Sequence, residues 1–307
     1  MSQLLFSLKP TPPFRLNLTV WLLRRRAHNE IDSWDGRQYR RALLCGDRVI
    51  ELCVSERTKG HAPMLDVVLS GERILDRDKR LAAGMLDRLL GLSVDLSRFY
   101  ELAADDRKLA PLADRFKGVK PPRFPSVFET LVNAFACQQL SLDVGIHLLN
   151  GLTRSFGVAV ARRAVGVHAF PSPAALAHLS AETLRALKFS RQKAQSIIEL
   201  SDALSRGGLD LEELMGYPDD ALLGRLQLLR GIGRWSAEYA LLRGFGRLHV
   251  FPADDVGAWH GLQRWLGLRK PLDYGRAVRL VNRWRPYAGM VYFHLLLDRL
   301  EREGHLG

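Results

Sequence analysis

The amino-acid sequence predicts an α+β N-terminal domain, with an antiparallel sheet and a helix, followed by an all-helical domain. In the first 92 residues short apolar runs alternate with polar residues, the period-two pattern of half-buried strands. From Leu96 onward apolar residues recur at spacings of three and four, which is typical of helices, and the alternation nearly vanishes. The expected domains are therefore residues 1–92 and 93–307.

The N-terminal domain is expected to contain four strands, at residues 14–20, 39–44, 49–54 and 65–69. Their connections are too short for crossover helices, so the sheet should be antiparallel. Cys45-Gly46-Asp47 suits a tight turn between the second and third strands. A helix is expected over residues 78–90, stopped by Gly91.

The helical domain is expected to break at three places. Residues 117–125 contain three prolines within five residues, which remove amide donors and favour extended backbone. Gly207-Gly208 and Gly216-Tyr217-Pro218 predict two further breaks.

Composition favours a polyanionic partner. The 307 residues include 45 Lys and Arg against 33 Asp and Glu, a formal charge of +12, and 47% are hydrophobic, which excludes a disordered chain. A membrane surface is the competing partner, but no apolar run reaches the roughly 18 residues of a membrane span and residues 1–13 do not resemble a signal peptide. A cytoplasmic protein is expected. Cys45, Cys53 and Cys137 are too few and too dispersed for a disulfide framework or a four-cysteine cluster.

One glycine-containing segment has the pattern of two helices joined by a hairpin, carried by Leu226, Leu229, Gly231, Ile232, Gly233 and Ala237. Glycine permits positive φ and close approach of the backbone, and the unpaired amides of the following helix can hold a phosphate. The alternative is an ordinary helix C-cap at Gly231. Arg230 and Arg234 favour phosphate binding.

Asp254 and Asp255 stand about twenty residues after this hairpin, at the expected start of another helix. Alone, either aspartate would be interpreted as an N-cap. The rigid apolar approach at residues 250–253 and the proximity of the hairpin favour a second interpretation, in which one aspartate caps the helix and the other reaches into a cleft.

These residues resemble the helix-hairpin-helix DNA glycosylase superfamily, specifically the bacterial 3-methyladenine-DNA glycosylase II (AlkA-like) branch. The core of the resemblance lies at residues 228–239, 242–244 and 250–255, with weaker support at 128–129, 138–141, 191–194 and 284–287. It implies a helix-hairpin-helix glycosylase domain. Its active-site cleft would lie between two helical subdomains, about 124–225 and about 93–123 plus 226–307.

The resemblance also assigns roles. Asp255 would be the catalytic carboxylate, stabilising positive charge at the sugar C1′ during hydrolysis of the N-glycosidic bond. The base would be flipped out of the duplex into a pocket walled by Trp235, Tyr239 and Tyr287, whose faces attract a cationic methylated base. Core packing is the alternative for these three aromatics, and it is favoured for Tyr239. Gln139 would fill the vacated stack. The expected DNA-binding residues are Gln139, Arg230, Gly231, Ile232, Gly233, Arg234 and Arg243.

Departures from sister families narrow the chemistry. Bifunctional relatives have a lysine nucleophile where this chain has Trp235, so a monofunctional hydrolase without AP-lyase activity is implied. No cysteine follows Cys137, which excludes an iron–sulfur cluster, and no other cofactor is expected. Relatives can hold Na⁺ or K⁺ on hairpin carbonyls, here those of Gln227, Leu229 and Gly231.

The sequence thus predicts a monomeric glycosylase of base-excision repair that acts on double-stranded DNA containing alkylated purines, with 3-methyladenine as the leading candidate lesion. A non-catalytic binder of damaged DNA and an oxidised-base glycosylase are the alternatives. Arg24-Arg25-Arg26 has the pattern of a solvated face. His260 and His294 lack a partner at metal-ligand spacing, so core or surface positions are expected for both.

Overall fold

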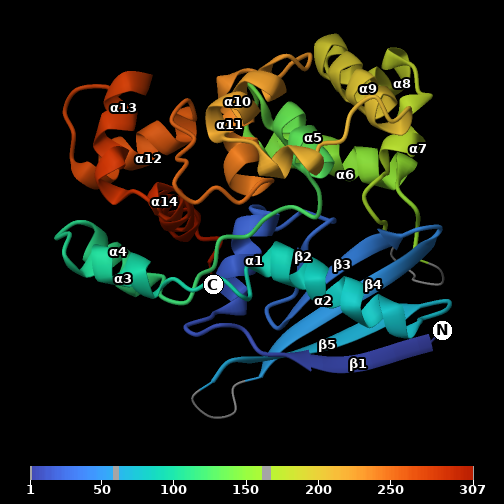
Figure 1. Cartoon of the computed structure of the whole chain (residues 1–307), viewed down its shortest axis with the longest axis horizontal. Coiled ribbons are helices and arrows are strands. Elements are labelled where there is room, and N and C mark those ends of the chain that lie inside the picture. Colours follow the sequence, from blue (N-terminus) through green and yellow to red (C-terminus); the bar gives the residue numbers. More distant parts are fainter. Residues whose placement is uncertain (1, 58–61, 161–166, 307) are drawn as a thin grey trace.

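The computed structural model describes residues 2–57, 62–160 and 167–306, and its N-terminal part is a five-stranded antiparallel sheet (Figure 1). The strand order is β1-β5-β4-β3-β2. The predicted strands at 39–44, 49–54 and 65–69 and the turn at Gly46, where φ is +67°, are confirmed. The strands are β1 (Ser2–Leu8), β2 (Ser33–Trp34), β3 (Gln38–Cys45), β4 (Arg48–Arg57) and β5 (Met64–Gly71).

The strand predicted at residues 14–20 is wrong, because this segment leads into helix α1 (Leu16–Arg24). Leu16, Val20 and Leu23 pack into the core beneath the sheet. Leu18 and Leu22 pack on the other side, into a core formed with C-terminal helices. A helix buried on both sides is apolar all round, so its sequence loses the amphipathic period that would have identified it.

Helix α2 (Asp76–Leu90) confirms the helix predicted over residues 78–90. It ends at Gly91, which adopts φ +60° and donates its amide to the carbonyl of Asp87. α1 and α2 both contribute to the core beneath the sheet, so they cover the same sheet face.

The rest of the chain is helical, as predicted, and the expected breaks are confirmed: residues 119–124 are extended, and non-helical backbone separates α9 from η1 and η1 from α10. One isolated bridge, between Ala159 and His168, lies among the described residues. The helices are α3 (Ser97–Ala104), α4 (Leu109–Arg115), α5 (Val127–Cys137), α6 (Leu142–Phe156), α7 (Pro173–Ala177), α8 (Ala181–Ala186), α9 (Arg191–Ser205), η1 (Glu213–Gly216), α10 (Asp219–Gln227), α11 (Arg234–Arg243), α12 (Val256–Leu266), α13 (Tyr274–Val281), η2 (Asn282–Trp284) and α14 (Ala288–Arg302).

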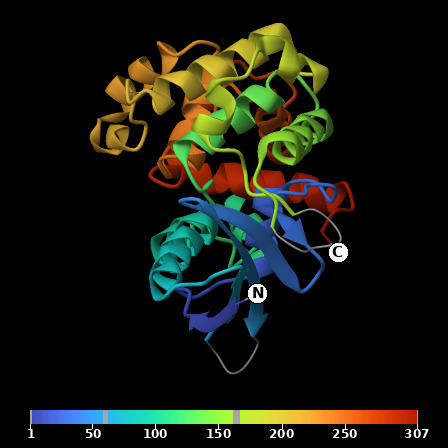
Figure 2. The ribbon, with the colours of Figure 1, turned by 90° about the vertical axis from the view of Figure 1, so that its right-hand side faces the viewer.

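Two hydrophobic cores divide these helices. The first core is formed by the helices from α5 through α11. The second core is formed by α3, α4, α12, α13 and α14 together with one side of α1. Residues 226–307, predicted to form one subdomain with residues 93–123, are divided between the cores: Leu226, Ile232 and Leu241 pack in the first core and Leu242 packs in the second. α11 therefore joins the two cores. α14 runs between the sheet and the upper helices (Figures 1 and 2).

The interpretation of Arg24, Arg25 and Arg26 as a solvated face is wrong. Their exposed fractions are 5%, 6% and 5%. Because α1 is packed between the sheet and the helical domain, its C-terminal end emerges inside the interface. Arg26 pairs there with Asp143 at 2.9 Å and Glu303 at 3.4 Å.

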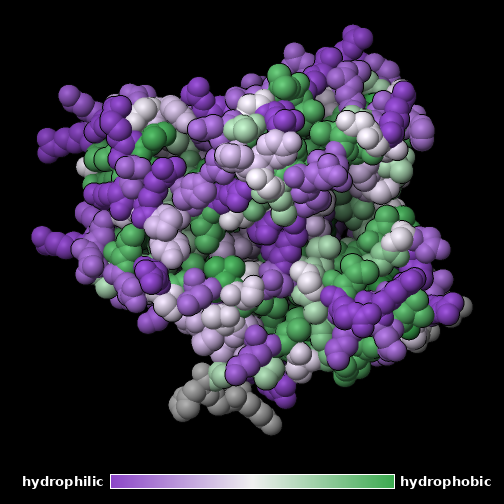
Figure 3. All heavy atoms as spheres, in the orientation of Figure 1, coloured by the Kyte–Doolittle hydropathy of each residue, from purple (hydrophilic) through white to green (hydrophobic). Residues whose placement is uncertain are grey.

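The surface agrees with the charged composition. Hydrophilic side chains gather over α12 and α13, and hydrophobic ones form scattered patches on the face seen in Figure 3. Within the described ranges, none of the helices combines the length and apolar character of a bilayer-spanning segment.

Candidate active site

The predicted hairpin lies between α10 and α11. Gly231 has φ +78°, and a Cβ added there would lie 2.4 Å from Oγ of Ser196 on α9. Only glycine suits both the left-handed backbone and this close approach. The Gly231 carbonyl accepts a hydrogen bond from Nε2 of Gln138 at 2.9 Å. The hairpin is therefore fixed against both α9 and the end of α5.

The N-cap of α11 is Gly233, which makes no side-chain cap hydrogen bond, so the first amides of α11 are available to an anion. Gly231, Gly233, Arg230 and Arg234 are exposed around this helix start. Arg230 lies 3.3 Å from Oε1 of Glu199, an exposed pair that holds the charge only weakly. Ile232 differs from its neighbours, since it is 5% exposed and anchors the hairpin in the core.

Asp255 is the N-cap of α12, and both of its carboxylate oxygens are held. Oδ1 accepts the amide of Ala258 at 3.0 Å, and Oδ2 accepts the hydroxyl of Tyr292 on α14 at 3.1 Å. Burial, and then the charge of Asp255, raise the pKa of Tyr292 well above its usual range, so this hydroxyl remains a donor. The same aspartate that caps the helix thus faces a cleft, and the predicted division of these two roles between Asp254 and Asp255 is wrong.

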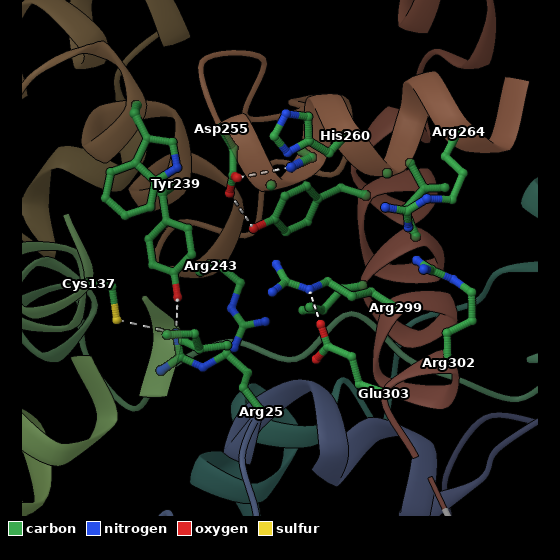
Figure 4. A pocket seen from close by; sticks show the side chains of 18 of the residues that line it. Arg25, Cys137, Tyr239, Arg243, Asp255, His260, Arg264, Arg299, Arg302 and Glu303 are labelled. Atoms are coloured by element: carbon green, nitrogen blue, oxygen red, sulfur yellow. Dashed lines mark hydrogen bonds and ion pairs between the residues drawn. The ribbon is translucent and has the colours of Figure 1, made fainter. Parts of the chain in front are cut away.

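Two cavities meet at Asp255. The α14 cavity, about 400 Å³, is enclosed mainly by α11, α12 and α14 (Figure 4). The hairpin cavity, about 750 Å³, extends from Asp255 along the start of α11 to α9. Asp255 and Trp235 line both cavities. A carboxylate at this junction lies between the hairpin and a concave space of ligand size.

Asp254 lines the hairpin cavity and not the α14 cavity. The buried side chain of Glu238 accepts the hydroxyl of Tyr274 through Oε1 at 2.8 Å, and its Oε2 is buried without a hydrogen-bond partner. Burial raises the pKa of Glu238, and the hydrogen bond from Tyr274 opposes this rise. Glu238 therefore joins α11 to the start of α13, a contact that its place within an unbroken helix did not reveal.

The three predicted pocket aromatics occupy different environments. Trp235 and Tyr239 stack with ring centroids 5.4 Å apart, and both line the α14 cavity. Tyr239 is 5% exposed, as core packing would require, yet its hydroxyl is directed to the cavity side, where Arg25 donates to it (Figure 4). Tyr287 packs edge-on against Phe99 in the C-terminal core and lines neither cavity.

The remaining predicted residues also separate. Gln139 is exposed, has φ +53° and lines the hairpin cavity. Arg243, expected to contact DNA, is 1% exposed and lines the α14 cavity instead of an outer surface. His260 is exposed beside that cavity, and His294 is fully buried, in agreement with the surface and core positions expected. In the part of the chain that the structure describes, no group of His, Cys, Asp or Glu could hold a metal ion.

The carbonyls proposed for a monovalent cation are partly engaged. The Leu229 carbonyl accepts the amide of Ile232 at 3.2 Å, and that of Gly231 accepts Gln138. Each retains a second lone pair, so both oxygens fit the requirement for Na⁺ or K⁺. The cation remains a prediction.

Sequence reasoning missed Tyr292 and Arg25. Tyr292 lies 37 residues after Asp255 and Arg25 lies in the N-terminal half of the fold, so neither spacing nor motif relates them to the site. Both are brought there by packing of α14 and α1 in a shared core.

Comparisons with known proteins agree with this geometry. Residues 132–286 match the family described as HhH-GPD superfamily base excision DNA repair protein. DNA-3-methyladenine glycosylase 2 of Escherichia coli (strain K12) is 24% identical over 95% of this chain and 96% of its own length. DNA-3-methyladenine glycosylase of Bacillus subtilis (strain 168) is 28% identical over 66% of this chain and 67% of its own. The chain spans 58% of a further B. subtilis relative.

A solved structure extends the likeness to the whole fold. The 3-methyladenine DNA-glycosylase from Archaeoglobus fulgidus has a TM-score of 0.84 and 25% identity, covering 96% of this chain and 98% of its own. The chain belongs to the HhH-GPD superfamily of base excision DNA repair proteins. The resemblance to the AlkA-like branch is confirmed by its near full-length match to the E. coli protein.

Proposed function

We propose that this protein is a monofunctional DNA glycosylase that hydrolyses the N-glycosidic bond of alkylated purines in double-stranded DNA, 3-methyladenine among them. The observation that carries the proposal is the position of Asp255, held at the junction of an enclosed cavity and a cavity beside the hairpin. The names of the E. coli and B. subtilis relatives support the choice of lesion.

In this mechanism the hairpin and the first amides of α11 hold a backbone phosphate. The damaged nucleotide swings out of the duplex, and its base enters the α14 cavity beside the stacked Trp235 and Tyr239. Gln139 fills the space that the base leaves. Phosphate and sugar then lie on the hairpin side of Asp255, and the base lies on the other.

Asp255 stabilises the positive charge that develops at C1′ as the bond to the base breaks. Water adds to C1′ and loses a proton, so the products are the free base and an abasic deoxyribose. The two hydrogen bonds from Ala258 and Tyr292 orient the carboxylate before reaction, and no solvent must reorganise around it. Trp235 cannot form the imine through which a lysine nucleophile would cleave the backbone, so the strand remains intact.

The experiment is a release assay on duplex DNA treated with a methylating agent. Free methylated base should appear with the wild type, and the abasic strand should break only after alkali. Tight binding without release would instead support a non-catalytic binder of damaged DNA. Release of 8-oxoguanine with strand cleavage would support an oxidised-base glycosylase.

A further inference from the structure

Two buried arginines beside the α14 cavity have no carboxylate partner, unlike a third buried arginine elsewhere. Arg41 is 1% exposed and pairs with both Asp32, at 2.7 Å, and Glu129. Arg25 and Arg243 are 6% and 1% exposed, and among the described residues neither has an acidic group within ion-pair distance. A buried charge without a counterion is unfavourable unless other groups accept its hydrogen bonds.

The partners that Arg25 does have are neutral. One terminal nitrogen donates to the hydroxyl of Tyr239 at 3.2 Å and lies 4.0 Å from Sγ of Cys137, and the other donates to Oδ1 of Asn133. Its Nε is buried without a partner. Because Nε is buried, the capacity that remains for a ligand is the second hydrogen of the terminal nitrogen that donates to Asn133.

Arg243 is less satisfied. Nη2 donates to the carbonyl of Leu22 at 2.9 Å, and Nε is buried without a partner. The guanidinium centres of Arg243 and Arg25 lie 4.8 and 5.6 Å from the ring centroid of Phe124, so an aromatic ring partly offsets both charges. Burial, and to a smaller extent the charge of Arg25, lower the pKa of Arg243.

Both side chains line the α14 cavity, and Figure 4 places the guanidinium of Arg25 below the Tyr239 hydroxyl with that of Arg243 beside it. We propose that these two guanidinium groups read the edge of the extruded base and select purines that present a carbonyl oxygen at C6, that is, guanine-type lesions over adenine-type lesions. The inference rests on the proposed function and adds an order of preference among its lesions.

The selection follows from the hydrogen-bonding capacity of the groups. A guanidinium only donates. The edge of guanine offers two acceptors, O6 and N7, whereas the edge of adenine offers N7 and an amino group that is itself a donor. An adenine-type base would place this donor against two buried cations. 3-Methylguanine and 3-methyladenine carry the methyl group on the same nitrogen and the same positive charge, so they differ in the way that this test requires.

The proposal also gives the N-terminal domain a task at the base. Arg25 is the C-cap of α1 and adopts a left-handed conformation, with φ +57°. This ends the helix and lets the side chain turn toward α5 and α11, whose Asn133 and Tyr239 it contacts. The sheet and α2 then act as the support that holds α1, and Arg25 with it, against the glycosylase core.

The test measures both methylated bases released from one methylated duplex. Each rate is divided by the spontaneous rate from the same DNA without protein. Wild type should release 3-methylguanine about tenfold faster than 3-methyladenine on this scale. Arg25→Met and Arg243→Met should each bring the ratio toward one, mainly by slowing release of 3-methylguanine.

Arg26→Met is the matched control, because Arg26 is a buried neighbour of Arg25 that lines neither cavity. Its ratio should match the wild type, and an equal change in this variant would overturn base reading in favour of a general disturbance of the loop. Arg25→Lys, which keeps a donor, should give an intermediate ratio. If the methionine variants do not fold, the ratio of Arg25→Lys is compared with the wild-type ratio instead.

The outcomes separate the two proposals. Release of neither base by the folded wild type contradicts the glycosylase function itself. Release of both with a wild-type ratio near or below one, or a ratio unchanged in folded Arg25→Met and Arg243→Met, leaves the glycosylase function standing and refutes the guanidinium reading.

Discussion

Replacing Asp255 by asparagine removes a charge and almost nothing else. Asparagine is as good an N-cap as aspartate, so its side-chain oxygen can still accept the Ala258 amide, while its amide nitrogen takes the place of Oδ2 and donates to the Tyr292 hydroxyl. Two unit charges about 4 Å apart interact by about 4 kcal/mol at an effective dielectric constant of about 20. Since C1′ carries much of a unit charge when the bond breaks, kcat for base release should fall by about a hundredfold to a thousandfold.

The assay is single-turnover release of methylated base, with enzyme in excess over DNA, so that binding and chemistry are measured separately. Asp255→Asn should bind methylated duplex as tightly as wild type and unfold at the same temperature. Asp255→Ala is the comparison, because it also removes the cap and should lose about 0.5–2 kcal/mol of stability. A folded Asp255→Asn variant that releases base at more than a tenth of the wild-type rate would refute the electrostatic role given to this carboxylate.

Three further predictions concern positioning, DNA binding and stability. Tyr292→Phe should lower kcat about tenfold without changing KM, because the Asp255 carboxylate loses one of the two hydrogen bonds that orient it; an unchanged kcat, or a loss that appears only in KM, would contradict this. In fluorescence titrations wild-type affinity should fall with a slope of about −0.9 in log K against log salt for each phosphate held, and Gly231→Ala should bind more weakly with a smaller slope because its Cβ would meet Ser196; equal slopes would argue against a phosphate at the hairpin. Burial lowers the pKa of His294 from 6.5 to about 4, so between these pH values the unfolded chain binds a proton that the folded chain does not. In urea titrations the free energy of unfolding should therefore fall by roughly 3 kcal/mol as the pH is lowered from about 6.5 to about 4. His294→Gln should lack this fall, and an equal fall in that variant would refute the assignment.

Local sequence signals predicted those elements whose environment is simple. In β3, β4 and β5 apolar and polar residues alternate because one face of the sheet packs against α1 and α2, so the period of two was visible in the sequence. α1 was lost because it is buried on two sides, and β2 is only two residues long, too short for any periodic signal. Residue pattern therefore identifies an element only when the element has one buried face and is long enough to repeat that pattern.

The same distinction applies to the site. The hairpin and Asp255 were found because their functions depend on backbone conformation and on spacing along one segment, both of which a sequence displays. Tyr292, Arg25 and Glu238 act through contacts between segments far apart in the chain. Tyr287 was misplaced for a related reason, since an aromatic in a helical pattern can face a cavity or the neighbouring core, and here it faces Phe99.

Net charge illustrates how far composition reaches and where it stops. The excess of +12 favours a polyanionic partner, but it counts every arginine alike. In the structure Arg41 is neutralised by two carboxylates, Arg230 is exposed at the hairpin, and Arg243 faces an enclosed cavity without a counterion. We therefore expect Arg41 to contribute to the stability of the fold, Arg230 to phosphate affinity and Arg243 to base selection. Only the second should respond strongly to salt, because ions screen exposed charges far more than buried ones, so raising the ionic strength should weaken binding while leaving the ratio of released bases unchanged.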